Sequence, residues 1–423
     1  MLGNDIMQTT TSVMRVAGFA FLAGMTSSTP VRAETLNALF MAQAAYSDND
    51  VRAMTHDFEA ANPGTTVNLE FVPYEALFDK IVASKAAGGS GYDVVLYDVI
   101  WPAAFARDGV LQDVTARVKA SIDTAKIFDG AWSTSLYDGK YYGLPWILDT
   151  KYLFYNTDML AKAGIAAPPK TWDELLADAK VLKDKKIVDY PIVASWSQAE
   201  AVICDYATLT AAHGGTYYTD GKPSFDQGGS LDAVNTMTQS LKDGLTNPNS
   251  KEYLEEDVRK VFSSGNAAFA LNWTYAYAKA NDPAESKIVG KVGVVPAPGV
   301  AGKTEASAVN GSMGLGITAG SAHSDLAWKY IAFLTSQAEQ NKYAQLSLPI
   351  WKSSYDDPAV TKGQEPLVSA AKTAIAVMSL RPVTPAYQEV STILQKEIQN
   401  ALTGKATPAE AMASADKEAA RLR

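Results

Sequence analysis

Short apolar runs alternate with amphipathic segments in the first quarter of the chain. The runs "TLNALFMA" (35 to 42), "TTVNLEFVP" (65 to 73) and "YDVVLYDV" (92 to 99) have the length and the β-branched and aromatic content of strands. Segments with helical spacing of apolar residues separate them, near 49 to 61 and 75 to 87. This β-α-β-α-β order predicts a parallel, doubly wound sheet of the α/β class.

A second α/β segment follows in the middle of the chain. A helix is expected in "APPKTWDELLADAKVLKDK" (167 to 185), because Thr171 and Glu174 have capping-box spacing and apolar residues recur on one face. Further strands are expected at "PIVASW" (191 to 196), "AAFALNW" (267 to 273), "VGVVPAPG" (292 to 299) and "GLGIT" (314 to 318), with helices near 198 to 212 and 230 to 243. Two such units suit 423 residues, which are too many for one compact core.

The amino terminus has the composition of a secretory signal. Arg15 precedes the apolar run "VAGFAFLAGM" (16 to 25), and "VRAE" (31 to 34) places the small residue Ala33 at a suitable cleavage point. A buried first helix is the alternative, but the apolar run has the length of a signal core and is too short to span a bilayer. We therefore expect a signal peptide over 1–33 and a protein of the Gram-negative periplasm.

Charge and cysteine content exclude several classes of function. The formal net charge is -9, with 46 acidic and 37 basic residues, and the sequence contains no block of lysine and arginine. A nucleic-acid partner is therefore not expected. The single cysteine, Cys204, allows no intramolecular disulfide and lies far from the signal, so an amino-terminal lipid anchor is not expected either. His56, His213 and His323 lack metal-ligand spacing, and we expect neither a metal nor a cofactor.

Candidate ligand-binding residues follow the predicted strands. Ligands of doubly wound sheets bind outside the carboxyl ends of the strands. Aromatic rings there can cover the apolar face of a sugar, while short polar side chains bind its hydroxyl groups. The predicted strand ends carry Tyr46, Tyr74, Glu75, Asp98, Trp101, Trp146, Asp149, Trp196, Asn272 and Trp273. The alternatives are packing in a core for the tryptophans, and helix capping or pairing with a lysine for the aspartates.

One of these stretches, "YGLPWILDTKYLFYNTDM" (142 to 159), combines a strand pattern with an indole and a carboxylate three residues apart. An ionised aspartate in a buried strand is costly unless it is paired. We therefore expect this stretch to cross between two lobes and to border a ligand cleft, with Trp146 and Asp149 on the cleft wall.

Several stretches, taken in order, resemble the family 1 extracellular solute-binding proteins of carbohydrate ABC importers, the maltose-binding-protein-like family. The resemblance covers essentially the whole chain after the signal. Its segments include "FEAANPGTTVNLEFVPYEALFDKI", "AAGGSGYDVVLYDVIWPAAFARDGVLQDV", "YYGLPWILDTKYLFYNTDMLAKAGIAAPPKTWDEL", "VFSSGNAAFALNW", "NGSMGLGIT" and "RPVTPAYQEV".

The resemblance implies a two-lobed periplasmic binding protein fold with a ligand cleft between discontinuous lobes. Residues 34–148 and 295–334 would form lobe 1, and residues 149–294 and 335–423 would form lobe 2. It further implies a monomer that binds a sugar in the cleft, closes by hinge bending, and delivers the sugar to an inner-membrane ABC permease without catalysis.

The family's binding positions carry over where this sequence matches them. The loop at 97 to 101 corresponds to a family segment with stacking and hydroxyl contacts, and Trp273 follows the "AAF" strand as the family aromatic does. Asn310 stands where the family usually has a glycine. Together these positions favour Tyr97, Asp98, Trp101, Trp146, Asp149, Trp273, Asn310, Gly311 and Arg381 as ligand contacts.

The function expected from these observations is capture of a neutral sugar or polyol. Few arginines and lysines stand at the strand ends, which argues against a phosphate, sulfonate or carboxylate ligand. The alternative is a secreted carbohydrate-active enzyme, a glycosidase or lyase, for which Asp98 and Asp149 would be the candidate carboxylate pair. A binding protein for an iron chelate or a polyamine is a second rival.

Overall fold

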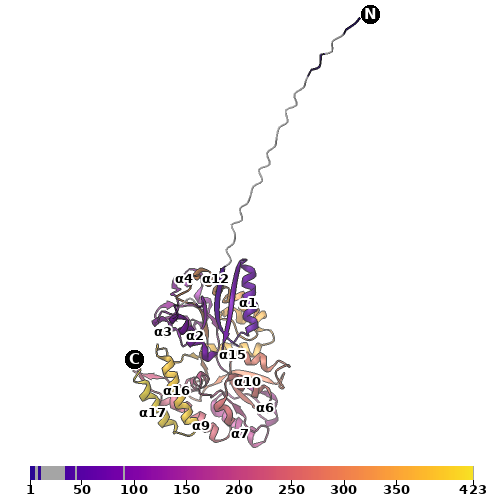
Figure 1. The fold of residues 1–423 in the computed structure, drawn as a ribbon. Coiled ribbons are helices and arrows are strands. Elements are labelled where there is room, and N and C mark those ends of the chain that lie inside the picture. Colours follow the sequence, from indigo (N-terminus) through magenta and orange to yellow (C-terminus); the bar gives the residue numbers. More distant parts are fainter. Residues whose placement is uncertain (5–7, 11–33, 43–44, 89–90, 423) are drawn as a thin grey trace.

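The protein consists of two α/β units, one above the other in Figure 1. The structure is a computed structural model that describes residues 1–4, 8–10, 34–42, 45–88 and 91–422. Most of the expected signal peptide, 1–33, lies outside these residues. In the described part of the chain, no helix combines the length and the hydropathy that a bilayer-spanning segment needs.

The first unit contains a five-stranded sheet with the order β2-β1-β3-β14-β6. The first three strands in the chain are parallel, as the β-α-β-α-β pattern predicts, and β14 is antiparallel to both β3 and β6. The bounds are β1 (Glu34–Met41), β2 (Thr65–Val72), β3 (Val94–Asp98), β6 (Leu144–Ile147) and β14 (Met313–Ile317).

The second unit contains a six-stranded sheet with the order β15-β13-β12-β7-β11-β8. Its centre is antiparallel, with β7 between β12 and β11, and its two edge strands, β15 and β8, pair in parallel with their neighbours. The bounds are β7 (Tyr152–Asn156), β8 (Ile192–Val193), β11 (Phe269–Asn272), β12 (Val292–Pro298), β13 (Ala306–Val309) and β15 (Met378–Ser379).

Two short hairpins complete the strands. Each turns on an Asp-Gly pair, Asp138-Gly139 and Asp220-Gly221, in which both residues have positive φ, the conformation that two-residue hairpin turns require. The strands are β4 (Leu136–Tyr137), β5 (Lys140–Tyr141), β9 (Tyr218–Thr219) and β10 (Lys222–Pro223).

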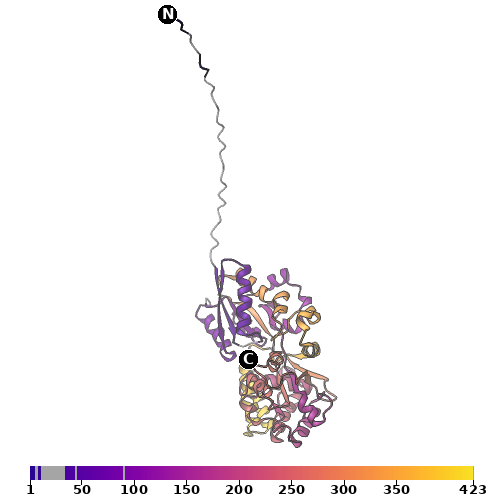
Figure 2. The same cartoon turned by 90° about the vertical axis from the view of Figure 1, so that its right-hand side faces the viewer.

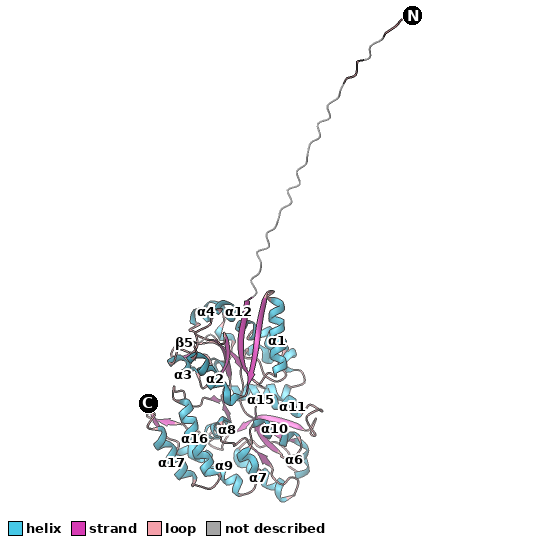
Figure 3. Cartoon of the chain, in the orientation of Figure 1, coloured by secondary structure: helices cyan, strands magenta, loops and turns pink. Residues whose placement is uncertain are grey.

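Helices cover both faces of the first sheet (Figure 1, Figure 3). One face carries Leu36, Phe40 and Trp146 and packs under α1 and α12, whereas the opposite face carries Leu39 and Tyr97 and packs under α2 and α3. The helices are α1 (Asp48–Ala61), α2 (Tyr74–Ala86), α3 (Pro102–Arg107), α4 (Thr115–Ser121), η1 (Thr124–Lys126), α5 (Asp129–Trp132) and α12 (Ser324–Leu334).

The second sheet is also buried on both faces. Leu153 and Phe269 face α7, α8, α9, α16 and α17, and Phe154 and Ala270 face α10 and α15. The helices are α6 (Thr157–Ala163), α7 (Trp172–Asp184), α8 (Glu200–Ala212), α9 (Gly228–Lys242), η2 (Pro248–Glu252), α10 (Glu255–Ser263), α11 (Tyr275–Ala280), α15 (Glu365–Ala376), α16 (Tyr387–Leu402) and α17 (Pro408–Ala419). Three short helices connect α12 to α15: α13 (Gln337–Lys342), η3 (Lys352–Asp356) and α14 (Pro358–Thr361).

The helix starts follow from local sequence. Ser47 and Asp50 form a reciprocal capping box at α1, and the hydroxyl of Thr171 accepts the backbone N–H of Glu174 at 3.2 Å at α7. The carboxylate of Glu174 accepts the backbone N–H of Lys170 and not that of Thr171, so the expected capping box at α7 is formed on one side only.

The chain passes between the two sheets more than once. It leaves the first sheet after Ile147 and enters the second at Tyr152. The return differs from the boundary expected near residue 295, since β12 pairs with β7 as far as Pro296 and then forms a hairpin with β13. The second passage is therefore at 310–312, between β13 and β14. Figure 2 shows the same two units after a quarter turn, again one above the other.

Candidate functional site

A cavity of about 610 Å³ lies between the two units. The first unit contributes the ends of β1, β3 and β6 and the starts of α1 and α2, and the second contributes the starts of α8, α10 and α11. In the first unit, the carboxyl ends of the parallel strands and the amino ends of the helices that follow them meet at this edge of the sheet. Polar and charged lining residues are Ser47, Asp48, Tyr74, Glu75, Asp98, Asp149, Glu200, Cys204, Glu255, Glu256, Trp273, Tyr275, Lys279, Glu285 and Arg381.

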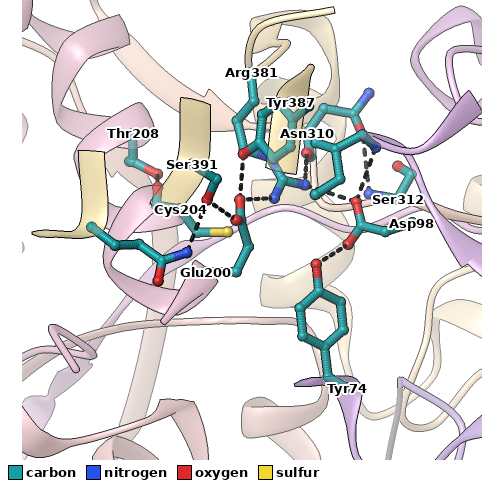
Figure 4. A network of polar contacts seen from close by, with 12 residues as sticks. Tyr74, Asp98, Glu200, Cys204, Thr208, Asn310, Ser312, Arg381, Tyr387 and Ser391 are labelled. Carbon is teal, nitrogen blue, oxygen red and sulfur yellow. Dashed lines mark hydrogen bonds and ion pairs between the residues drawn. The ribbon is translucent and has the colours of Figure 1, made fainter. Parts of the chain in front are cut away.

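Arg381 lies at the centre of a buried network in the cavity wall (Figure 4). Its Nη2 donates to Oδ1 of Asp98 at 3.0 Å and to the carbonyl of Asn310 at 3.2 Å, and its Nη1 donates to Oε1 of Glu200 at 2.6 Å. The hydroxyl of Tyr74 donates to Oδ2 of Asp98 at 3.1 Å. Because Asp98 ends β3 of the first sheet and Glu200 begins α8 of the second unit, this guanidinium connects the two units.

A second buried network holds Trp273 in place. The ammonium group of Lys151 is fully buried and lies 2.6 Å from Asp205, 3.2 Å from Glu255 and 5.1 Å from the centre of the Trp273 ring. The indole N–H of Trp273 donates to Oε1 of Glu255 at 3.3 Å. Burial disfavours the charged form of Lys151, but the carboxylates of Asp205 and Glu255 outweigh it and raise the pKa of the lysine.

Gly311 lies against the same indole from the passage between β13 and β14. A Cβ atom at this position would overlap the six-membered part of the Trp273 ring, so only glycine allows this close approach. The backbone N–H of Gly311 donates to the carbonyl of Asp149 at 3.0 Å. The passages at 148–151 and 310–312 therefore meet beside Trp273.

Asp149 lies in the first passage and is 5% exposed. Its Oδ1 accepts the hydroxyl of Thr274 at 2.6 Å, the N–H of Thr274 at 3.2 Å and the N–H of Thr150 at 2.8 Å. In the described part of the chain it forms no ion pair. Burial raises its pKa to about 7, although the Thr274 and Thr150 donors favour the ionised form.

The structure brings together seven of the thirteen candidate ligand contacts on the cavity wall: Tyr74, Glu75, Asp98, Asp149, Trp273, Gly311 and Arg381. They come from both units and from the passages at 148–151 and 310–312.

The other six candidates do not line the cavity. Trp146 packs between Phe40 and Tyr46 in the core of the first unit. Trp101 stacks on the ring of Tyr74, and the centres of the two rings are 5.8 Å apart. The ring of Tyr97 covers glycines of β14, and Trp196 is buried in the core of the second unit. Away from the cavity the structure places Tyr46, Tyr97, Trp101, Trp146, Trp196 and Asn310.

Asn310 does not line the cavity and instead hydrogen-bonds to the backbone of two other residues. Its amide donates to the carbonyl of Gly130 at 2.8 Å and its Oδ1 accepts the N–H of Ser312 at 3.0 Å. These bonds hold the passage between β13 and β14 against the first unit.

Sequence reasoning missed the contribution of helix starts from the second unit. Glu200 begins α8, Glu255 and Glu256 begin α10, and Tyr275 begins α11. A signal was present, because "SQAE" and "YLEED" each place a carboxylate at the first turn of a predictable helix, where the helix dipole favours it. Lys151 gave no such signal, since a lysine next to a strand is normally exposed.

Comparison with known proteins identifies the family. Residues 28–341 match the family described as bacterial extracellular solute-binding protein. A Deinococcus radiodurans protein named "Probable ABC transporter-binding protein" is 30% identical over 385 residues, which cover 87% of this chain and 89% of that protein.

Solved structures with the same fold are similar over almost the whole chain. The maltose-bound MalE3 of T. maritima is 30% identical, with a TM-score of 0.84, over 91% of this chain and 99% of that one. A ribitol complex of a solute-binding protein from Agrobacterium radiobacter K84 is 27% identical, with a TM-score of 0.84, over 93% and 100% of the chains. A Thermotoga lettingae protein bound to alpha-D-tagatose is 28% identical, with a TM-score of 0.81, over 91% and 98%. This chain is therefore a two-lobed member of the bacterial extracellular solute-binding protein family of ABC transporters.

Proposed function

We propose that this protein is the periplasmic substrate-binding component of an ABC importer, which captures a sugar or polyol between its lobes and delivers it to an inner-membrane permease. The observation that carries the proposal is the cavity between the two units, whose walls combine aromatic rings with hydrogen-bonding side chains from both. Relatives at 27–30% identity were solved with maltose, ribitol and alpha-D-tagatose.

The residues of the cavity suit a polyhydroxylated ligand. Trp273, Tyr74 and Tyr275 offer ring faces, and Asp149 and Glu255 offer carboxylate oxygens that can accept hydroxyl groups. The only arginine and lysine in the described lining, Arg381 and Lys279, are already paired with carboxylates, which supports excluding an anionic ligand.

Closure would follow from contacts on both lobes. A ligand that touches Tyr74 in the first lobe and Trp273 in the second gains interactions only when the lobes approach, so it favours the closed state over the open one. A monomer suffices for this mechanism. The sugar leaves unchanged, because transport needs no bond to be broken.

The rival enzyme hypothesis is less well supported. Asp98, one of the two carboxylates nominated for it, accepts Tyr74, Arg381 and the backbone N–H of Ile100, which leaves little scope for a nucleophile or a base. The family to which the chain belongs consists of transport binding proteins.

A thermal-shift screen tests the proposal. Protein purified after expression of the full chain is screened with monosaccharides, disaccharides, polyols, amino acids, polyamines and iron chelates. A ligand at one hundred times its Kd adds about 2.7 kcal/mol to the stability of the folded state and raises Tm. A shift with a sugar or polyol that is recovered unchanged supports the proposal. A shift confined to another ligand class, or consumption of the sugar, contradicts it. Amino-terminal sequencing of the periplasmic protein should begin at Glu34.

A further inference from the structure

The cavity wall contains more buried negative charge than buried positive charge. Arg381 is shared between two carboxylates, Asp98 and Glu200, and the side chains of all three are at most 11% exposed. One guanidinium compensates one of the two carboxylate charges and leaves an excess of one negative charge. Burial raises the pKa of Glu200 even though Arg381 opposes that shift, which indicates that the compensation is incomplete.

The same stoichiometry recurs around Lys151 in the second unit. Its ammonium group is shared between Asp205 and Glu255, whose side chains are 1% and 19% exposed. Burial raises the pKa of Asp205 although Lys151 opposes it. Helix starts do not remove this excess. Glu200 and Glu255 stand at the starts of α8 and α10, where the helix dipole supplies about half a positive elementary charge, which does not compensate a full buried carboxylate.

Asp149 is a further buried carboxylate, and it has no cation partner among the described residues. The titratable groups that face it are the phenols of Tyr152 and Tyr355, which carry no positive charge. By contrast, Glu256 and Glu285 elsewhere in the lining are balanced by Arg259 and Lys279. Among the described residues, five buried carboxylates and two cations therefore gather in this part of the wall and directly behind it, with Asp205 and Lys151 behind the lining.

Two oxygens of this wall have no donor among the described residues, Oδ2 of Asp149 and Oε2 of Glu255. The two carboxylates bind adjacent residues, Trp273 and Thr274. Asp149 accepts the hydroxyl of Thr274, and Glu255 accepts the indole N–H of Trp273. Both carboxylates line the cavity beside the Trp273 ring. A cation that hydrogen-bonds to Asp149 and Glu255 would supply the positive charge that these carboxylates lack. Without a cation, protonation of the carboxylates would have to remove the excess negative charge.

We propose that the ligand of this cavity is an amino-substituted carbohydrate, an amino sugar or aminocyclitol, whose ammonium group binds Asp149 and Glu255 beside Trp273. This inference rests on the proposed function and specifies its substrate class. The ring carbons of the ligand contact Trp273, its hydroxyl groups bind the remaining polar lining, and its ammonium group takes the place of the proton that Asp149 otherwise holds.

Matched pairs of ligands test the charge directly. Isothermal titration calorimetry compares D-glucosamine with D-glucose, D-galactosamine with D-galactose, and chitobiose with cellobiose, with putrescine as a cation without a sugar ring. The amino member of at least one pair is expected to bind tenfold or more tightly than its neutral partner. At about pH 6, repeating the titration in buffers of different ionisation enthalpy should show proton release with the amino ligand and none with the neutral one.

A conservative variant locates the effect. Asp149→Asn keeps the shape of the side chain and should weaken amino-ligand binding at least tenfold, by a larger factor than it weakens binding of the neutral partner, and abolish proton release. Asp129→Asn is the control, because the Asp129 side chain is 98% exposed and outside the cavity lining. The proton-release measurement on the unmodified protein needs no variant and decides the question if Asp149→Asn folds poorly.

The possible failures are distinguishable. Neutral sugars that bind as tightly as their amino partners in every pair would overturn this inference and leave the proposed function intact. Putrescine binding in place of every carbohydrate would overturn both. No binding by any member of the panel would overturn this inference, and the proposed function would fall with it only if the thermal-shift screen also found no sugar or polyol.

Discussion

Arg381 and Asp98 form an ion pair that joins the two lobes at the base of the cavity. Nη2 of Arg381, two residues after β15 of the second sheet, lies 3.0 Å from Oδ1 of Asp98, the last residue of β3 in the first sheet. The two residues are 283 positions apart in the chain. Both are buried, so this contact compensates charge where water cannot.

Removal of that guanidinium should destabilise the whole protein. We expect Arg381→Met to lower the free energy of unfolding by about 3–5 kcal/mol, because it leaves Asp98 and Glu200 buried without a cation. Scanning calorimetry measures the loss. Arg107→Met is the matched control, since Arg107 is half exposed and its pair with Asp108 contributes about 1 kcal/mol at most. Equal Tm shifts for the two variants would show that the buried network is not stabilising.

Two tryptophans that follow the same sequence pattern should behave in opposite ways. Trp273→Ala should weaken ligand binding on the order of tenfold to a hundredfold, since a buried aromatic anchor contributes about 2 kcal/mol or more. Trp146→Phe should leave affinity unchanged and lower stability by on the order of 1–2 kcal/mol, because Trp146 packs on Phe40 and Tyr46 in the core. Calorimetric titration and thermal unfolding measure the two effects. A larger loss of affinity for Trp146→Phe than for Trp273→Ala would contradict this assignment.

Stability should depend on pH through Asp149. Its pKa is about 7 in the folded protein against an ordinary value of 3.8, so the folded state holds a proton that the unfolded chain has released between these values. The stabilising contribution is complete below about pH 4 and is lost as pH rises through about 7. Relative to wild type, Asp149→Asn should therefore gain stability as pH rises across this range. Urea unfolding of both proteins near pH 5 and near pH 8 measures the difference, and parallel curves would count against the raised pKa.

Cys204 should report the state of the cleft. It is the only cysteine, it lines the cavity from α8, and burial raises the pKa of its thiol. We expect slow alkylation by iodoacetamide in the folded protein, fast alkylation in urea, and a further several-fold slowing when a sugar closes the lobes. Mass spectrometry follows the single adduct. Faster alkylation in the presence of ligand would contradict closure over this cavity.

Short stretches of local sequence determine much of the secondary structure. The alternation of apolar runs and amphipathic segments determines β1 to β3 with the helices between them. The central strand β3 is apolar almost throughout because it is buried on both faces, whereas the edge strand β2 includes Asn68 and Glu70. Ser47 and Thr171 start their helices through hydroxyl groups that reach only three residues ahead. The order of motifs also indicated the family, which the comparisons confirmed.

Only the tertiary structure decided which polar and aromatic residues share the cavity. Trp146 and Trp273 both lie near the ends of apolar strands, yet the first is covered by Phe40 and Tyr46 and the second faces the cleft. The partners of Arg381 and Lys151 lie 54 to 283 positions away in the chain, and no local pattern encodes such pairings. The physical reason is that burial and charge compensation are properties of the space between elements, which exists only after the two sheets have packed against their helices.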